Sequence, residues 1–212
     1  MENTTQEQLW LGNFGQEYTE RNILDPGELD NAYMESFGVS RTKMNELFIM
    51  NLGLENKKIL EVGCNVGNQL RMLQKMGFNY LYGVELQPYA VQRAKDLTKG
   101  INIIQGVGDD LPFKDEYFDL VFTSGVLIHI APNTLPDIVK EITRCSKKYV
   151  WGFEYYSETF KDVEYRGNMD ALWKADYVKE YIKNCPEIKI VKQLQYKYLS
   201  NSDVDNMYLL SK

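Results

Sequence analysis

The chain has 212 residues, of which 44% are hydrophobic and 25% are charged. This length predicts one domain with room for a small appended element, and the composition excludes a disordered or fibrous protein. The formal net charge is −6, from 30 acidic and 24 basic residues. Because a negative surface repels a phosphate backbone, we expect a small ligand and no nucleic-acid partner.

The expected compartment follows from signals that the sequence does not contain. The longest apolar stretch, residues 120–131, is interrupted by Thr123, Ser124 and His129 and is too short to span a bilayer. The polar N-terminus, MENTTQEQ, has no apolar signal-peptide core. The three cysteines form no CxxC pair, and with a single histidine they make no metal-ligand cluster. We predict a cytoplasmic protein with no metal and no membrane segment; its oligomeric state cannot be read from the sequence.

Helical patterns dominate the first part of the chain. A capping box that begins at Thr4 opens a helical pattern that continues to Tyr18, although two glycines weaken it. A second helix is expected to begin after Ser40 and to end at Gly53. We therefore predict that residues 1–56 form a helical extension that caps the domain.

From residue 57 onward, apolar strands alternate with helical segments. Strands are expected at residues 58–62, 80–85, 101–105, 117–123, 148–154, 188–199 and 204–211. A further helix is expected around Trp173 and Tyr181. Alternation of this kind implies right-handed crossovers and a mainly parallel sheet, whereas the short loop before residue 204 can join only antiparallel neighbours. The predicted fold class is α/β, with a Rossmann-like doubly wound sheet over residues 57–212 that ends in an antiparallel hairpin.

Two loops at the carboxyl ends of the strands, where such sheets bind ligands, point to a nucleoside. In the first, EVGCNVGN, Gly63 and Gly67 permit a tight turn and Asn65 tolerates a positive φ. Glu85 ends the next strand, where a carboxylate can accept hydrogen bonds from both ribose hydroxyls. NAD would fit both features, although asparagine replaces the second and third glycines of its fingerprint. A turn with no ligand is the remaining alternative.

A third and fourth loop contribute the string GDDLPFKDEYFDLVF. With the ExGxNxG loop, Glu85 and the terminal hairpin, this string resembles the class I S-adenosylmethionine-dependent methyltransferases over roughly residues 57–212. The chain departs from the family pattern at Asn65, where the middle glycine is expected, and at Val107, where a polar residue is frequent near the adenine. The resemblance implies S-adenosyl-L-methionine as the cofactor and S-adenosyl-L-homocysteine as the product.

The same resemblance implies contacts with each part of the cofactor. They are Glu61, Gly63 and Gly67 along the methionine, with Asn65 in the same loop; Glu85 at the ribose; Gly108, Asp109 and Leu86 around the adenine; and Thr123, Ser124 and Gly125 near the sulfonium. An apolar residue at the position of Leu86 is equally consistent with ordinary core packing.

A narrower resemblance covers the N-terminal segment. The strings EQLWLGNFGQEYTERN, ELDNAY and VGCNVGNQL are similar to the methylases associated with pseudaminic acid biosynthesis, small proteins taken to methylate a nonulosonic-acid sugar or its precursor. The resemblance implies a sugar-pathway metabolite as the acceptor. On physical grounds, the aromatic segment around Trp10 either closes over the cofactor as a lid or packs on the sheet edge. Tyr18 and Arg21 are predicted to contact the cofactor carboxylate.

Methyl transfer from a sulfonium mainly requires that the protein align the two reactants. A base is needed only when the acceptor is a hydroxyl or a protonated amine. His129, just past the fourth strand, is a candidate base, with a structural or acceptor-shaping role as the alternative. Glu154 ends the fifth strand and is the second catalytic candidate. Tyr155 and Tyr156 suit a sugar ring, and Arg166 suits an acidic acceptor. Ordinary packing or surface roles remain the alternative for the residues from the fifth strand onward.

The sequence thus predicts a methyltransferase that uses S-adenosylmethionine and acts on a small sugar-pathway metabolite. Two alternatives keep the cofactor: a methyltransferase of another metabolite or natural product, and a non-catalytic module that binds S-adenosylmethionine. An NAD-dependent oxidoreductase is disfavoured by the glycine pattern and the terminal hairpin.

Overall fold

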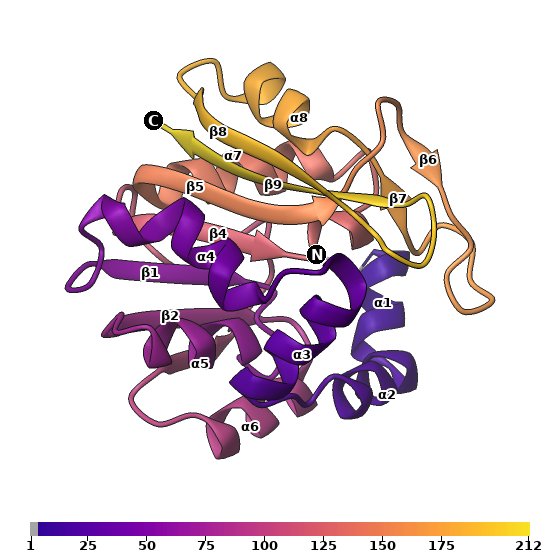
Figure 1. The fold of residues 1–212 in the computed structure, drawn as a ribbon. Coiled ribbons are helices and arrows are strands. Elements are labelled where there is room, and N and C mark those ends of the chain that lie inside the picture. Colours follow the sequence, from indigo (N-terminus) through magenta and orange to yellow (C-terminus); the bar gives the residue numbers. More distant parts are fainter. Residues whose placement is uncertain (1–3) are drawn as a thin grey trace.

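The computed structural model describes residues 4–212, which contain a seven-stranded sheet of order β3-β2-β1-β4-β5-β9-β8 (Figure 1). Its strands are β1 (Lys58–Val62), β2 (Tyr80–Glu85), β3 (Asn102–Gln105), β4 (Phe118–Ser124), β5 (Ser146–Tyr155), β8 (Lys189–Lys197) and β9 (Val204–Ser211). The first five are parallel, and β9 runs antiparallel between β5 and β8. The predicted Rossmann-like fold class, including the C-terminal antiparallel strands, is confirmed.

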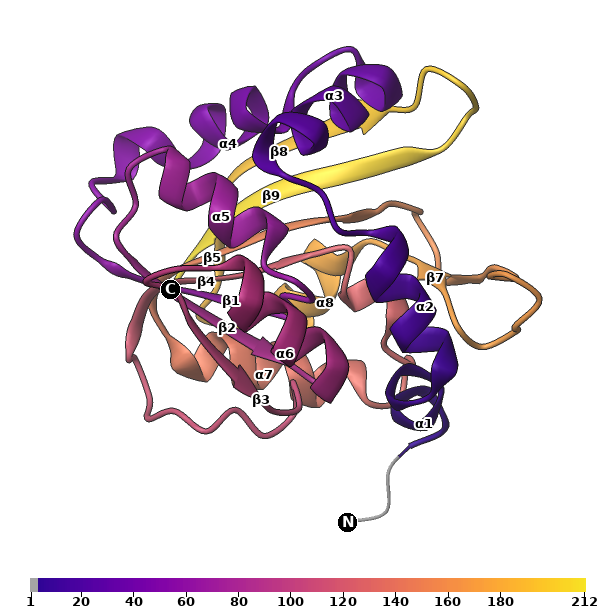
Figure 2. The ribbon, with the colours of Figure 1, turned by 90° about the horizontal axis from the view of Figure 1, so that it is seen from below.

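Helices cover both faces of the sheet (Figure 2). On one face lie α4 (Arg41–Ile49), α5 (Asn68–Lys75) and α6 (Pro88–Leu97); on the other lie α7 (Leu135–Cys145) and α8 (Tyr177–Asn184). Successive side chains of a strand point to opposite faces. Leu120 and Phe122 therefore join the core cluster beneath α4, α5 and α6, whereas Val121 joins the core cluster beneath α7 and α8. Both faces of β4 are therefore buried, which fixes the strand end that reaches the site.

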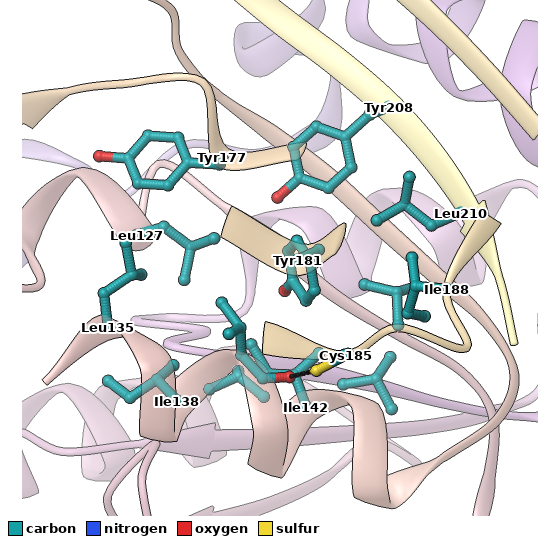
Figure 3. Packing of buried hydrophobic residues seen from close by; sticks show 14 of the residues in the cluster. Leu127, Leu135, Ile138, Ile142, Tyr177, Tyr181, Cys185, Ile188, Tyr208 and Leu210 are labelled. Atoms are coloured by element: carbon teal, nitrogen blue, oxygen red, sulfur yellow. Dashed lines mark hydrogen bonds between the residues drawn. The ribbon is translucent and has the colours of Figure 1, made fainter. Parts of the chain in front are cut away.

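The core beneath α7 and α8 is rich in tyrosine (Figure 3). Tyr181 of α8 and Tyr208 of β9 are fully buried, with ring centroids 5.9 Å apart. Gly152 of β5 makes room for Tyr208, because a Cβ there would lie 2.1 Å from the Cζ atom of that ring. This packing supports the carboxyl ends of β4 and β5 on the face of the sheet that α7 and α8 cover.

One predicted helix boundary is wrong. Trp173 does not belong to α8 but to β7 (Trp173–Lys174), which pairs with β6 (Lys161–Asp162) in a separate two-stranded ribbon. The side chain of Asp176 accepts a hydrogen bond from the Lys179 amide and ends the extended segment by capping α8. The helical spacing of the aromatic residues therefore spans two different elements.

The N-terminal helices are more numerous than predicted. The capping box at Thr4 is present, and α1 (Thr5–Leu11) is separated from α2 (Asn13–Arg21) at Gly12. A third helix, α3 (Pro26–Phe37), was not predicted, although Asp25 caps it and Pro26 occupies its first turn. Two 3₁₀ turns complete the set, η1 (Met50–Leu52) and η2 (Leu127–His129). None of the helices in residues 4–212 combines the length and the apolar character that crossing a membrane requires.

Candidate active site

A cavity of about 440 Å³ lies at the carboxyl ends of the central strands, beneath α1, α2 and α3. Ten of the predicted cofactor residues line it: Tyr18, Glu61, Gly63, Asn65, Glu85, Leu86, Gly108, Asp109, Ser124 and Gly125. His129, a predicted catalytic residue, lines the same cavity. The fold thus brings residues of four loops and of the N-terminal helices into one wall.

The loop after β1 is a tight turn of left-handed residues. Gly63, Asn65 and Gly67 have φ angles of 72°, 45° and 77°. A Cβ on Gly63 would lie 2.6 Å from the Cγ2 atom of Val126, so only glycine fits between this loop and the loop after β4. Gly67 caps α5 and does not line the cavity. Its left-handed backbone turns the chain from the loop into α5.

Glu85 connects two of the ligand loops. One carboxylate oxygen accepts a hydrogen bond from the Asn65 amide at 2.8 Å, and the other accepts from the Gln87 amide at 2.9 Å. Burial raises the pKa of Glu85, and these backbone donors oppose that rise. Each oxygen has further lone-pair capacity for a donor in the cavity. The carboxylate can therefore hold the loop and receive ligand hydroxyls together.

Several buried polar atoms of the wall have no hydrogen-bond partner among residues 4–212. They are Oε2 of Glu61, Oε1 of Gln69 and Nε1 of Trp10. Burial raises the pKa of Glu61 well above its ordinary value, while the positive charge of Arg41 opposes the rise. A buried unpaired polar atom costs about 1–3 kcal/mol, so a ligand that pairs with these atoms gains affinity.

His129 belongs to an aromatic wall with Trp10 and Tyr18. Its ring centroid lies 4.6 Å from that of Trp10, which in turn lies 5.1 Å from that of Tyr18. The His129 Nδ1 atom is 2.7 Å from the carbonyl oxygen of Ala171; we assign the ring proton to Nδ1, which leaves Nε2 unprotonated. Burial lowers the pKa of His129 to about 4. The ring is therefore neutral at pH 7.

Glu154 lies behind the cavity wall. Its two carboxylate oxygens accept hydrogen bonds from the Val126 amide at 3.0 and 3.3 Å, and the nearby amides of Leu127 and Ile128 act to lower its pKa. Burial raises the pKa of Glu154 to about 7. The side chain thus holds the start of η2, the turn that carries His129, and its predicted catalytic role stays a prediction.

Besides Glu154, six predicted site residues lie outside the cavity wall: Arg21, Gly67, Thr123, Tyr155, Tyr156 and Arg166. Arg21 is exposed, with its guanidinium 3.6 Å from the Glu17 carboxylate. Arg166 is exposed in a turn at a φ of 50°, and the Tyr155 ring lies 5.9 Å from that of Tyr198. Their roles toward a ligand stay predictions.

The wall also contains residues that the sequence analysis did not identify, among them Tyr33, Gln69 and Gln87. Tyr33 belongs to α3, a helix that the Asp25-Pro26 start signal could have predicted, although that signal does not place the helix over the cavity. Gln69 and Gln87 follow the two ligand loops directly, and no local pattern separates them from ordinary polar surface residues.

The N-terminal helices are attached to the ligand loops by polar contacts. Thr19 Oγ1 donates to Asn65 Oδ1 at 3.0 Å, and Gln87 Nε2 donates to the Trp10 carbonyl oxygen at 3.0 Å. Asn68 Nδ2 donates to the Asn22 carbonyl oxygen at 2.6 Å. Three different ligand-loop residues therefore fix these helices over the cavity.

Sequence comparison identifies the central part of the chain. Residues 60–151 match the family model described as a methyltransferase domain. The sterol 24-C-methyltransferase ERG6B of Gibberella zeae is 31% identical over 123 residues, which cover 55% of this chain and 32% of that protein. The uncharacterized methyltransferase sll0829 of Synechocystis is 31% identical over 106 residues, which cover 50% of each chain. The chain thus spans half or less of the length of these relatives.

Solved structures share the fold. The PH0226 protein from Pyrococcus horikoshii superposes with a TM-score of 0.65 at 16% identity, over 81% of this chain and 89% of that one. An S-adenosylmethionine-dependent methyltransferase from Methanosarcina mazei has a TM-score of 0.63 at 18% identity, over 77% and 96%. Residues 60–151 thus match a methyltransferase domain, and the chain has a fold found in S-adenosylmethionine-dependent methyltransferases; S-adenosylmethionine is the cofactor that this match and this fold imply.

The observed wall fits that cofactor. The unpaired Glu61 oxygen suits an ammonium group, Glu85 has lone pairs left for vicinal hydroxyls, and Gly63 leaves no side chain between its loop and Val126. Glu61, Glu85, Asp109 and Gln69 also make this wall rich in acceptors, as a ligand with an ammonium, a sulfonium and an adenine amine requires.

Proposed function

We propose that this chain transfers a methyl group from S-adenosylmethionine to a small-molecule acceptor. The strongest support is one arrangement: the carboxylates of Glu61 and Glu85 and the neutral ring of His129 line the same cavity at the carboxyl ends of the strands. When bound, the cofactor supplies a methyl group on a positively charged sulfur, which is an activated leaving group.

In this proposal the side chains of the chain bind and align. Glu61 receives the ammonium of the methionine part, Glu85 the ribose hydroxyls, and Asp109 the adenine amine. The aromatic wall of Trp10, Tyr18 and His129 keeps water from the reacting end. Alignment of this kind contributes on the order of 7–11 kcal/mol in favourable cases.

His129 acts on the acceptor through Nε2. Because its pKa is lowered to about 4, it is unprotonated at neutral pH but is a weak base. Its role in the proposal is to accept a hydrogen bond from an acceptor hydroxyl or amine and to orient that group. Glu154 then acts as a positioning residue, because it holds the turn that carries His129.

For the acceptor we propose a sugar of the nonulosonic-acid pathway, supported by the N-terminal resemblance and by the three phenol and indole rings of Trp10, Tyr18 and Tyr33 in the wall. The relatives named as sterol 24-C-methyltransferases favour a second class, an acceptor that is methylated at a carbon atom. A cytoplasmic location and the division into a cap of residues 1–56 and a domain of residues 57–212 also belong to this proposal.

Calorimetric titration with S-adenosylmethionine, S-adenosylhomocysteine and NAD tests the cofactor, on the wild type and on Glu85→Ala. We expect micromolar binding of the first two ligands, no binding of NAD, and a loss of about tenfold or more in Glu85→Ala. Binding of NAD, with no binding of S-adenosylmethionine or S-adenosylhomocysteine, would contradict the proposal. Methyl transfer is then assayed with a nonulosonic acid and with a sterol; turnover of neither, with the cofactor bound, would favour the non-catalytic module.

A further inference from the structure

The cavity wall contains no lysine or arginine among the residues that the structure describes, yet a fully buried arginine lies directly behind it. Arg41 of α4 is 0% exposed. Its Nε atom donates to Asn45 Oδ1 at 2.9 Å, and its Nη1 atom donates to the Tyr33 hydroxyl at 3.0 Å. Tyr33 lines the cavity, so the buried cation is one hydrogen bond away from a ligand.

Arg41 lacks the partner that a buried guanidinium normally has. No carboxylate of residues 4–212 is within salt-bridge distance of it, and its Nη2 atom is buried without a hydrogen-bond partner. Aromatic rings surround it instead, with its central carbon 4.6 Å from the Phe153 ring and 5.4 Å from the Trp151 ring. The guanidinium also acts electrostatically on the buried carboxyl groups of Glu61 and Asp205, but its Nη2 atom keeps a donor that no acceptor fills.

Tyr33 is placed to pass the effect of that charge to a ligand. Burial raises the pKa of Tyr33, so the phenol keeps its proton at pH 7. The oxygen already accepts from Arg41, so the O–H group is left as a donor, with Ser124 of the cavity wall as its neighbouring hydroxyl. A hydrogen bond from a cationic donor polarises the phenol and strengthens its own donation to an anion.

We infer that Tyr33 is a carboxylate-binding residue of the cavity, with Arg41 as the positioning residue that supplies the positive charge behind it. The inference rests on the proposed function, which supplies two sources of a carboxylate: the methionine end of the cofactor and an acidic acceptor. It replaces Arg21 in the role that the sequence predicted, since Arg21 lies outside the wall and beside Glu17.

The test compares Tyr33→Phe with the wild type by calorimetry, using S-adenosylhomocysteine and 5′-methylthioadenosine, which lacks the amino-acid end. If the carboxylate is that of the cofactor, affinity for S-adenosylhomocysteine falls about tenfold, and affinity for methylthioadenosine stays unchanged. Arg41→Met is expected to show the same selective loss, and a general folding defect would weaken both ligands equally. Tyr196→Phe is the matched control: Tyr196 also packs on Phe153, at 6.1 Å, but does not line the cavity.

A third arm tests the acceptor as the source of the carboxylate. N-acetylneuraminic acid is titrated into protein saturated with S-adenosylhomocysteine; a loss confined to this acid in Tyr33→Phe supports a carboxylate on the acceptor. Equal affinities of wild type and Tyr33→Phe for all three probes would overturn the inference and leave the proposed function intact. If the wild type binds neither nucleoside, the proposed function and this inference fail together.

Discussion

The two halves of the cavity wall are built in different ways. The cofactor half, in the loops after β1, β2 and β3, uses backbone amides and carboxylates that lie close together along the chain, such as Glu85 and Gln87. The other half is formed by the N-terminal helices and η2, and it is held by contacts as distant in sequence as the hydrogen bond from Gln6 to the Asp170 carbonyl oxygen, 164 residues away. A short motif can encode the first half, whereas only the folded chain assembles the second.

Burial separates the halves as clearly as sequence distance does. No residue of α1 is buried, and α2 buries only Gly15 and Thr19, whereas α5, which follows the first cofactor loop, buries Gln69, Leu70, Met72 and Leu73. Elements with few buried apolar contacts open at a smaller free-energy cost than core elements. The cofactor half is therefore part of the rigid core, and the helices over it are expected to open more easily.

The largest expected effect is in the cofactor half. Gly63→Val would put a β-branched residue at a φ of 72° and a Cβ 2.6 Å from Val126. We expect the loss of more than about 1000-fold in affinity for S-adenosylhomocysteine, equal to about 4 kcal/mol, measured by calorimetry. Gly77→Val is the control, because Gly77 has a φ of 99° but no atom within 4 Å of its added Cβ. Binding within tenfold of the wild type in Gly63→Val would contradict the role of this loop.

How much the sequence could predict follows the same division. The strand-loop-helix pattern predicted β1, β2 and β9 at their observed bounds, and the residues of the cofactor loops meet in the cavity. Tyr33 and Arg41 could not be predicted as neighbours of the site. Their position depends on how α3 and α4 pack on the sheet, and that packing leaves no short-range signal. Arg21 was the arginine near the aromatic motif in sequence, but helix geometry turns it toward Glu17.

His129 joins the two halves, so its titration reports whether the N-terminal helices are closed. Its lowered pKa, about 4 against an ordinary 6.5, means that the unfolded state binds a proton more readily between these values. Stability is therefore lost as the pH falls from 6.5 to 4. Compared with His129→Asn, which does not titrate, the wild type should lose roughly 3 kcal/mol over this range in urea unfolding. If the difference in unfolding free energy between the wild type and His129→Asn does not change with pH, the His129 ring is exposed in solution and the N-terminal helices are open.

Asp205 of β9 lies opposite Tyr155, which ends the strand predicted to contact the acceptor. The pH dependence of its effect on stability tests how polar the interior beside this strand end is. Burial raises the pKa of Asp205 to about 7, so its ionised form destabilises the folded state, and stability falls as the pH rises from about 4 to 7. Asp205→Asn keeps an acceptor for the Tyr198 hydroxyl and should gain roughly 2 kcal/mol more at pH 8.5 than at pH 5. Asp203→Asn is the comparison, because that carboxylate pairs with Lys174 at 2.6 Å and its removal should give no such gain. An equal response of the two variants would show that the carboxyl group of Asp205 is hydrated.

The smallest effect concerns the attachment of the N-terminal helices. The Gln87 amide nitrogen donates to the carbonyl oxygens of Trp10 at 3.0 Å and Leu11 at 2.9 Å, where α1 ends. Gln87→Ala leaves these carbonyls without that donor, so we expect hydrogen exchange about tenfold faster in residues 5–21 and unchanged in the central strands. Gln92→Ala, an exposed change in α6, the helix that Gln87 caps, should alter neither region. If Gln87→Ala leaves the exchange of residues 5–21 unchanged, aromatic packing around Trp10 and His129 holds these helices, and the two halves of the wall open as one unit.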